Sequence, residues 1–238
     1  MNSIKKTTTS PLIRARIAGF AYLLLLPAPF GLIYVPSLLI VWGDAAATAS
    51  KIMASEMLFR LGMVSNLLVH IVSIFLVLAL YQLLKPVSKN MASLMVIFVL
   101  VGVPIVLLNE IFQLAVLRLL SGADYLTAFT TDQLQALALL FLNLHEQGLN
   151  IAQIFWGLWL FPLGYLVFKS GFLPRILGIL LIIGGFGYLV QSFAVFLAPG
   201  WNVNIIFITS WGEMLLLLWL LIKGVDVEKW EKRAAESG

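Results

Sequence analysis

Six long apolar runs occupy most of the chain, and they constrain its fold more than any other feature of the sequence. A helix needs about 20 apolar residues to cross the hydrocarbon core of a bilayer. The runs cover residues 17–41, 57–84, 91–120, 148–168, 172–197 and 203–223. They predict an all-α polytopic membrane bundle of six transmembrane helices. One membrane domain, 17–223, would then be preceded by a tail of residues 1–16 and followed by a tail of residues 224–238.

The basic residues fall almost entirely on one side of this six-span arrangement. Of the 15 Lys and Arg residues, twelve lie in the two tails, in the turns after the second and fourth runs, or at the ends of the runs that adjoin them. The other three are Lys51, Arg60 and Arg118. Because cationic loops stay on the cytoplasmic side during membrane insertion, we expect both termini inside the cell.

The composition excludes an ordinary soluble domain. Only 11% of the residues are charged and 61% are hydrophobic, whereas soluble domains carry about 25% charged residues. The lipid bilayer is therefore the expected partner. The net charge of +4 comes from cations at the membrane margins and in the tails, which favours contact with anionic lipid over nucleic acid. The chain has no cysteine, which excludes disulfides and thiolate metal sites.

Local signals predict where the spans bend and begin. Pro27 and Pro29 break the hydrogen-bond ladder of the first run, so we expect a kink there. Asp44 precedes an alanine-rich segment and is a typical N-cap, which predicts a short helix on the outer surface. Glu56 and Arg60 are four residues apart and can pair along one helix face.

The segment before the fourth run is too long for one crossing. No strong helix breaker occurs from Asp132 to Pro162, and a single helix through residue 168 would be about 55 Å long. We therefore expect residues 133–145 to form an outer surface helix or a re-entrant helix, ahead of the fourth span at 148–168. The C-terminal tail is mixed in charge and is expected to end as a frayed helix.

Polar side chains form one stripe on each of several spans. Asn143, Glu146, Asn150 and Gln153 follow spacings of three, four and three, which place them on one helix face. An ionisable group at mid-bilayer costs about 2.5–3.5 kcal/mol, so it needs a partner, a cavity or a function. All the stripes map to the middle or outer half of the membrane, which predicts a shared polar chamber open to the outer side. The candidate ligand-binding residues are Asn66, His70, Asn109, Glu110, Gln113, His145, Glu146, Asn150, Gln153, Gln191 and Glu213.

Simpler interpretations of the same residues stay open. Asn and Gln within spans often only hydrogen-bond neighbouring helices, at about 0.6 kcal/mol each. A zinc site could use His70 and His145 with Glu110 or Glu146, but the spacing matches no zinc motif. The two histidines could also hold haem, although their estimated depths differ. We expect no cofactor.

Glycines and aromatic residues in the last three spans favour packing roles. Gly178, Gly184, Gly185 and Gly187 lie inside an apolar run with no preceding strand, so they predict close helix packing rather than a nucleotide loop. The aromatic residues between positions 155 and 165 are expected to face lipid or to pack against other helices.

Four segments of the chain are similar to one known family. They are LLPAPFG at 25–31, FRLG at 59–62, GLNIAQIFWGLWLFPLGYLVFK at 148–169 and GFLPRILG at 171–178. They resemble a family of bacterial multi-span proteins catalogued as domain of unknown function 4386, and the resemblance extends over residues 16–221. It implies a helical bundle in a bacterial cytoplasmic (inner) membrane, and it implies no activity.

Three functional hypotheses remain. In the first, the chamber binds or transports a small molecule or a lipid, with Glu110, Glu146 and Glu213 as polar contacts. In the second, the protein is a membrane enzyme in which His70 or His145 exchanges protons with Glu110, with or without a metal. In the third, the bundle has a structural or sensory role.

Overall fold

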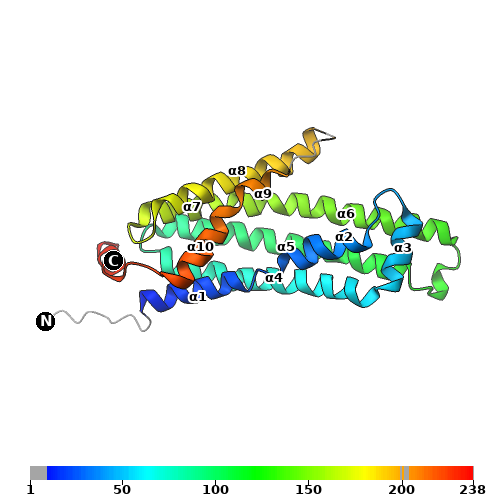
Figure 1. Cartoon of the computed structure of the whole chain (residues 1–238), viewed down its shortest axis with the longest axis horizontal. Coiled ribbons are helices and arrows are strands. Elements are labelled where there is room, and N and C mark those ends of the chain that lie inside the picture. Colours follow the sequence, from blue (N-terminus) through cyan, green and yellow to red (C-terminus); the bar gives the residue numbers. More distant parts are fainter. Residues whose placement is uncertain (1–9, 199, 201–203, 238) are drawn as a thin grey trace. The chain divides into compact units, whose positions relative to one another are not determined.

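The computed structural model describes residues 10–198, 200 and 204–237, and every regular element in these residues is a helix. Figure 1 shows the elements, coloured from blue to red along the chain. In order they are α1 (Pro11–Leu23), the π-helix η1 (Phe30–Tyr34), α2 (Val35–Leu39), α3 (Ala45–Ala54), α4 (Glu56–Leu84), α5 (Lys89–Leu119), the 3-10 helix η2 (Asp124–Leu126), α6 (Thr131–Leu158), α7 (Leu160–Ser170), α8 (Arg175–Leu197), α9 (Ile205–Thr209), α10 (Trp211–Ile222) and α11 (Val227–Glu236). The expected all-α fold is confirmed.

Five helical segments are long and apolar enough to cross a membrane. They are Glu56–Leu84, Lys89–Leu119, Thr131–Ser170, Arg175–Leu197 and Ile205–Ile222. Large apolar side chains on these segments stay exposed, such as Phe75 at 64%, Leu108 at 65% and Ile222 at 69%. Water would penalise such a surface and lipid does not. The chain is therefore a multi-pass membrane protein, while the six-span count and the orientation stay predictions.

The expected first crossing, residues 17–41, is broken in its middle. Helix α1 ends at Leu23, a turn follows, and the chain resumes its helical path near Pro29 before η1. Pro27 has no N–H to donate, and its own carbonyl accepts from Phe30 N at 3.0 Å and from Ser65 Oγ at 3.2 Å. The predicted kink is thus confirmed, and a side chain of α4 helps to satisfy the backbone at the break.

The segment ahead of the fourth crossing differs from its prediction. Residues 133–145 do not form a separate surface or re-entrant helix, because α6 continues without interruption from Thr131 to Leu158. The helix ends where Pro162 cannot donate a hydrogen bond to the Leu158 carbonyl. Gly148 does not break the helix, because it is the position at which a side chain of α5 packs closely, as described below.

The chain divides into two compact units, and the helices α4, α5 and α6 each contribute to both. The first unit comprises residues 1–23, 73–101 and 153–238, and the second comprises residues 24–72 and 102–152. In the second unit, the predicted cap and ion pair are both confirmed. Asp44 accepts a hydrogen bond from Ala47 N at 2.8 Å, and Arg60 Nη2 lies 2.6 Å from Glu56 Oε1.

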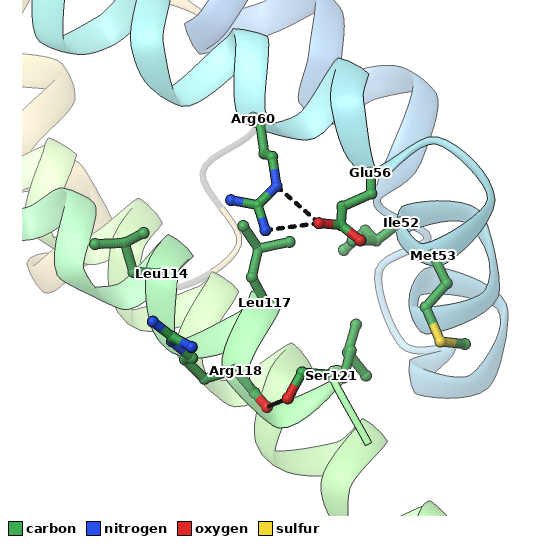
Figure 2. A pocket seen from close by; sticks show the side chains of 9 residues that line it. Ile52, Met53, Glu56, Arg60, Leu114, Leu117, Arg118 and Ser121 are labelled. Carbon is green, nitrogen blue, oxygen red and sulfur yellow. Dashed lines mark hydrogen bonds and ion pairs between the residues drawn. The ribbon is translucent and has the colours of Figure 1, made fainter. Parts of the chain in front are cut away.

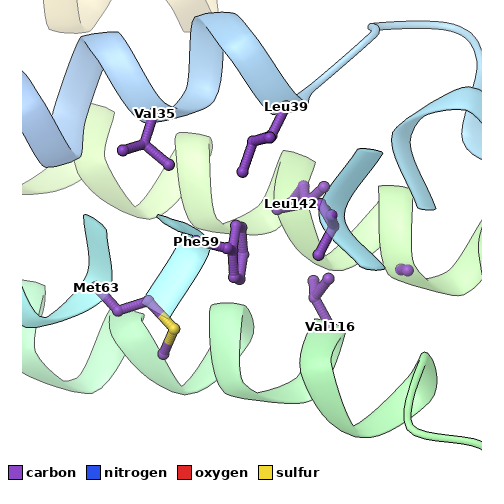
Figure 3. Close-up of a cluster of buried hydrophobic side chains, with 8 residues drawn as sticks. Val35, Leu39, Phe59, Met63, Val116 and Leu142 are labelled. Atoms are coloured by element: carbon purple, nitrogen blue, oxygen red, sulfur yellow. The ribbon is translucent and has the colours of Figure 1, made fainter. Parts of the chain in front are cut away.

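An apolar layer forms the core of the second unit near α3. Figure 3 shows Phe59 and Met63 of α4 beside Val116 of α5 and Leu142 of α6, with α2 covering them. The full layer consists of Val35, Leu39, Ile52, Phe59, Met63, Val116, Ala138 and Leu142, all of them buried. This layer is called the apolar layer below.

Close glycine contacts pack the first unit. A Cβ atom on Gly164 of α7 would lie 2.7 Å from the Gly178 carbonyl oxygen of α8, and one on Gly157 of α6 would lie 2.8 Å from that of Gly185. Only glycine permits backbones to approach so closely. Phe161 and Phe186 then meet edge to face, with ring centroids 4.9 Å apart. The packing role predicted for the glycines is confirmed, and the aromatic residues pack as well.

The C-terminal tail ends in an anchored helix rather than a frayed one. The Trp230 side chain of α11 is buried, and its Nε1 donates to the Leu83 carbonyl at 2.8 Å. Asp226 caps α11 by accepting from Lys229 N at 3.2 Å. The hydrogen bond from the Lys229 side chain also holds the pKa of Asp226 below its usual value. The expectation of a frayed helix is wrong because Trp230, the one large apolar residue on this helix that is buried, anchors it.

Candidate functional site

A buried polar cluster lies among α4, α5 and α6 in the second unit. Asn66 Nδ2 of α4 donates to Glu110 Oε1 of α5 at 3.2 Å. His145 Nε2 of α6 lies 3.2 Å from the same oxygen. Asn109 Nδ2 donates to the His145 carbonyl at 2.8 Å. The cluster places an acid and a base in contact where water is scarce, because the side chains of Glu110 and His145 are only 3% and 9% exposed.

His145 has two neighbours that require different positions of its proton. Glu110 Oε1 can only accept a hydrogen bond when it is ionised, so it favours a proton on Nε2. Gln113 Nε2 can only donate, and it lies 3.0 Å from the same His145 atom, so it favours an unprotonated Nε2. With the proton on Nε2, the ring donates to Glu110, and Gln113 Nε2 retains only the longer contact with His145 Nδ1 at 3.4 Å. With the proton on Nδ1, Nε2 accepts from Gln113 and Glu110 loses this donor. His145 therefore links proton occupancy to the arrangement of the cluster.

Two acceptor oxygens in the cluster lack donors. Glu110 Oε2 and Asn66 Oδ1 are both buried and have no hydrogen-bond partner among the described residues. A buried polar atom without a partner costs about 1–3 kcal/mol, and a charged one costs more. Asn66 is also tied to its own helix, because the His70 Nδ1 atom lies 2.7 Å from the Asn66 carbonyl oxygen. Two hard oxygen acceptors thus lie in one cluster.

Two glycines shape the cluster. A Cβ atom on Gly148 of α6 would collide with the Asn109 amide, and one on Gly31 of η1 would collide with the Asn66 amide. Each glycine therefore makes room for an amide that bonds within the cluster. Gly31 lies in the π-helical turn that follows the proline break, so the kink brings the backbone of η1 against Asn66.

The apolar layer closes the cluster on the side of α3. Met63 lies three residues before Asn66, Val116 three residues after Gln113, and Leu142 three residues before His145. On each helix the layer is therefore about 4.5 Å nearer to the α3 end than the cluster is. In this conformation the expected outward opening is filled by buried apolar side chains.

The structure groups about half of the expected site residues. Asn66, His70, Asn109, Glu110, Gln113 and His145 are buried and contact one another in the second unit. Asn150 is also buried on α6, whereas Glu146 is exposed. Of the two neighbouring candidates on α6, His145 faces the cluster and Glu146 of the expected stripe is exposed. The burial of Ala138, Leu142 and Ala152 defines that face, and their helical spacing points to His145.

The remaining expected residues belong to the first unit. Gln191 Oε1 accepts from Ile205 N at 3.1 Å, and so it holds the start of α9. Glu213 accepts from the Tyr22 hydroxyl at 3.5 Å and also hydrogen-bonds Tyr188. Gln153 Oε1 is buried without a hydrogen-bond partner among the described residues. No sequence pattern identifies these two tyrosines, because tyrosine is common in apolar spans and the two follow no characteristic spacing.

The site offers little for a metal of the kind considered from the sequence. No group of three or more His, Asp or Glu side chains able to hold a metal ion occurs within residues 10–198, 200 and 204–237. His145 and Glu110 are two residues of the types that bind zinc, and the other cluster members supply amides. The expected lack of a cofactor stays a prediction.

The fold and the cluster together define a multi-pass helical membrane protein with a buried carboxylate and histidine. The chain belongs to the family described as domain of unknown function DUF4386, whose model matches residues 17–224. The family resemblance seen in the sequence is thereby confirmed.

The chain is also similar to a curated protein. The chain is 36% identical over 157 residues to an uncharacterized protein of Archaeoglobus fulgidus, and the match covers 66% of this chain and 80% of that protein. No solved structure matches the chain. The relative carries no assigned activity in its name, so the site must be interpreted from its own chemistry.

Proposed function

We propose that the chain binds a small monovalent cation at the Glu110–His145 cluster, in exchange for a proton. The observation that carries this proposal is the pair of buried oxygens without donors, Glu110 Oε2 and Asn66 Oδ1. Oxygen ligands suit hard cations. A cation that contacted Glu110 Oε2 would satisfy this oxygen and would neutralise the buried carboxylate.

The charge of the cluster supports a monovalent ligand. Glu110 is the only carboxylate that contacts His145 through its side chain at this site. With His145 neutral, the cluster carries one negative charge, and burying an uncompensated charge is costly. One monovalent cation restores neutrality, whereas a divalent ion would leave an excess positive charge in the low-dielectric interior.

Protonation of His145 provides the competing way to reach neutrality. A protonated ring donates to Glu110 Oε1 and forms a buried ion pair at 3.2 Å. The cluster then needs no further positive charge. A cation and a proton on the cluster are therefore alternatives, and by linkage the cation binds more tightly as the proton concentration falls.

The apolar layer supports a gated route rather than an open chamber. Buried apolar constrictions can block ions by excluding water. Phe59 and Met63 lie between the cluster and the α3 end of the second unit, which the basic-residue pattern places outside the cell. The cluster would exchange its ligand with the outer side when this layer rearranges, which would amount to binding or transport of a small solute.

The test compares thermal unfolding of the purified full-length protein in mild detergent with and without added cations. Lithium, sodium and potassium chlorides serve as probes, and choline chloride at equal ionic strength serves as a cation too large for the cluster. A ligand at ten times its dissociation constant raises the unfolding free energy by about 1.4 kcal/mol. We expect one of the small cations to raise the Tm above the choline value, and more so at pH 8 than at pH 6.

Two glutamine variants decide whether the effect arises at the cluster. Glu110→Gln removes the buried charge and should abolish the specific Tm rise. Glu146→Gln changes an exposed carboxylate next to His145 on the same helix and should retain it. A cation response that survives in Glu110→Gln, or a wild-type protein with the same Tm in all four salts, would contradict the proposal.

A further inference from the structure

A second candidate site lies in the same unit, beside the apolar layer. A cavity of about 270 Å³ opens between α3, α4 and α5. Figure 2 shows Arg60 of α4 and Arg118 of the facing α5 among the residues that line it. Its lining residues are Ile52, Met53, Glu56, Arg60, Leu114, Leu117, Arg118, Leu120 and Ser121.

The cations of this cavity are unusual for their place in the chain. Only three of the 15 basic residues fall outside the tails, the basic turns and the run ends that adjoin them, and two of those three line this cavity. The third, Lys51, donates to the Leu38 carbonyl at 3.3 Å. Cations on the outer side oppose the usual charge bias of membrane proteins, so their meeting in one cavity calls for a local function.

The two arginines carry one positive charge more than their surroundings neutralise. Arg60 Nε and Nη2 contact Glu56 Oε1 at 2.7 and 2.6 Å. Both side chains are about half exposed, and such a surface pair contributes only about 0.2–1 kcal/mol. Arg118 has no acidic partner among the described residues. A ligand with one negative charge would satisfy Arg118 and could share Arg60 with Glu56.

Part of the cavity wall is apolar. Leu114, Leu117 and Leu120 line one side. Ile52 of α3 belongs both to the cavity and to the apolar layer, so the two meet at this residue. A ligand that fits this arrangement has an anionic head for the guanidinium groups and a hydrocarbon chain for the leucines. Guanidinium groups bind phosphate and carboxylate oxygens through paired hydrogen bonds.

We infer that this cavity binds an anionic phospholipid, with its phosphate between Arg60 and Arg118 and its hydrocarbon chain against the leucines. The inference does not depend on the cation proposal, because the two sites share no polar residue.

Lipid retention by the full-length protein tests the inference. The detergent-purified protein is incubated with phosphatidylglycerol, with phosphatidylcholine, or with sodium phosphate. Native mass spectrometry counts bound lipid, and the Tm measures protection. We expect phosphatidylglycerol to be retained and to raise the Tm, and phosphatidylcholine to do so more weakly. Protection by phosphatidylglycerol without protection by sodium phosphate supports binding through both head group and chain, whereas equal protection by sodium phosphate contradicts it.

Two types of variant locate the binding. Arg118→Gln should weaken retention about tenfold or more, since a hydrogen bond to a charged group is lost, and Arg60→Gln should weaken it as well. Leu114→Phe keeps both charges and fills the apolar side of the cavity. Arg175→Gln is the matched control, because Arg175 lies over the Phe168 ring in the first unit.

Two results would overturn the inference. The first is retention of phosphatidylglycerol that is unchanged in both Arg118→Gln and Leu114→Phe. The second is equal retention of phosphatidylcholine and phosphatidylglycerol by the wild-type protein. If Arg118→Gln fails to fold, Leu114→Phe alone still decides, because Leu114 is 48% exposed and tolerates a larger apolar side chain.

Discussion

At the scale of single residues, His145 determines how the cluster can behave. Its Nε2 atom lies 3.0 Å from an amide nitrogen and 3.2 Å from a carboxylate oxygen. One proton on Nε2 cannot serve both contacts, so the cluster has two alternative arrangements. Histidine is the side chain that changes charge between about pH 5 and 8. A cation that favours one arrangement will therefore shift the protonation of this ring.

Gly148 offers a test of how tightly the cluster is built. A methyl group at Gly148 would collide with the Asn109 amide that bonds the His145 carbonyl. Overpacking costs about 1–3 kcal/mol, which exceeds the gain of about 1 kcal/mol from replacing glycine in a helix. We expect Gly148→Ala to lower the Tm and to weaken the cation response.

The double variant provides the control for this prediction. Asn109→Ala removes the amide and leaves room for the methyl group. Gly148→Ala should then cost little or nothing in the Asn109→Ala background, with a coupling of at least about 0.5 kcal/mol. Equal costs in both backgrounds would mean that Gly148 does not support the cluster through Asn109.

At the scale of elements, the C-terminal end of α4 is completed by distant parts of the chain. The last carbonyls of a helix lack partners within it. Arg14 Nη1 of α1 donates to the Gln82 carbonyl at 3.3 Å, and Trp230 Nε1 of α11 donates to the Leu83 carbonyl at 2.8 Å. The Arg14 guanidinium also lies 5.5 Å from the centre of the Trp230 ring. Helices α1 and α11 therefore cap α4 together.

Replacing Trp230 should release α11. Trp230→Ala removes a buried aromatic ring and the donor to Leu83, so we expect α11 to detach while the membrane helices stay folded. Limited trypsin digestion then cuts faster after Lys229, Lys232 and Arg233. Trp230→Phe keeps the ring without the donor and should give an intermediate rate. Trp42→Ala changes an exposed tryptophan of the second unit and should leave the rate unchanged. Equal rates in all variants would show that the Trp230 contacts do not hold α11.

The elements differ in how well the sequence predicts them. The spans at 57–84 and 91–120 match α4 and α5 within two residues, because long apolar runs in lipid must satisfy their backbone as helices. The prediction for residues 133–145 is wrong. Bilayer thickness limits only the length of helix that lies in lipid, so it does not limit the total length of α6. Polar spacing alone also does not distinguish Glu146 from His145 on α6.

At the scale of the whole molecule, the polar residues separate into two groups that their sequence positions do not distinguish. Glu110 belongs to the second unit and Glu213 to the first, although both are single carboxylates within apolar spans. Depth along a span can be estimated from the sequence, whereas the pairing of helix faces depends on close packing at positions such as Gly148 and Gly31. The structure groups these carboxylates in one cluster in each unit, each with its own partners, and the shared outward chamber stays a prediction.

The central claim is that a cation and a proton compete for the Glu110–His145 cluster, and direct measurement of proton release tests it most directly. The full-length protein is held in weakly buffered detergent solution with a pH indicator, between about pH 5 and 8, and the cation that raises the Tm is added. We predict the release of up to one proton per chain from the wild-type protein and from Glu146→Gln, and none from Glu110→Gln. Cation binding without proton release at any pH in this range, or equal release from Glu110→Gln, would contradict the claim.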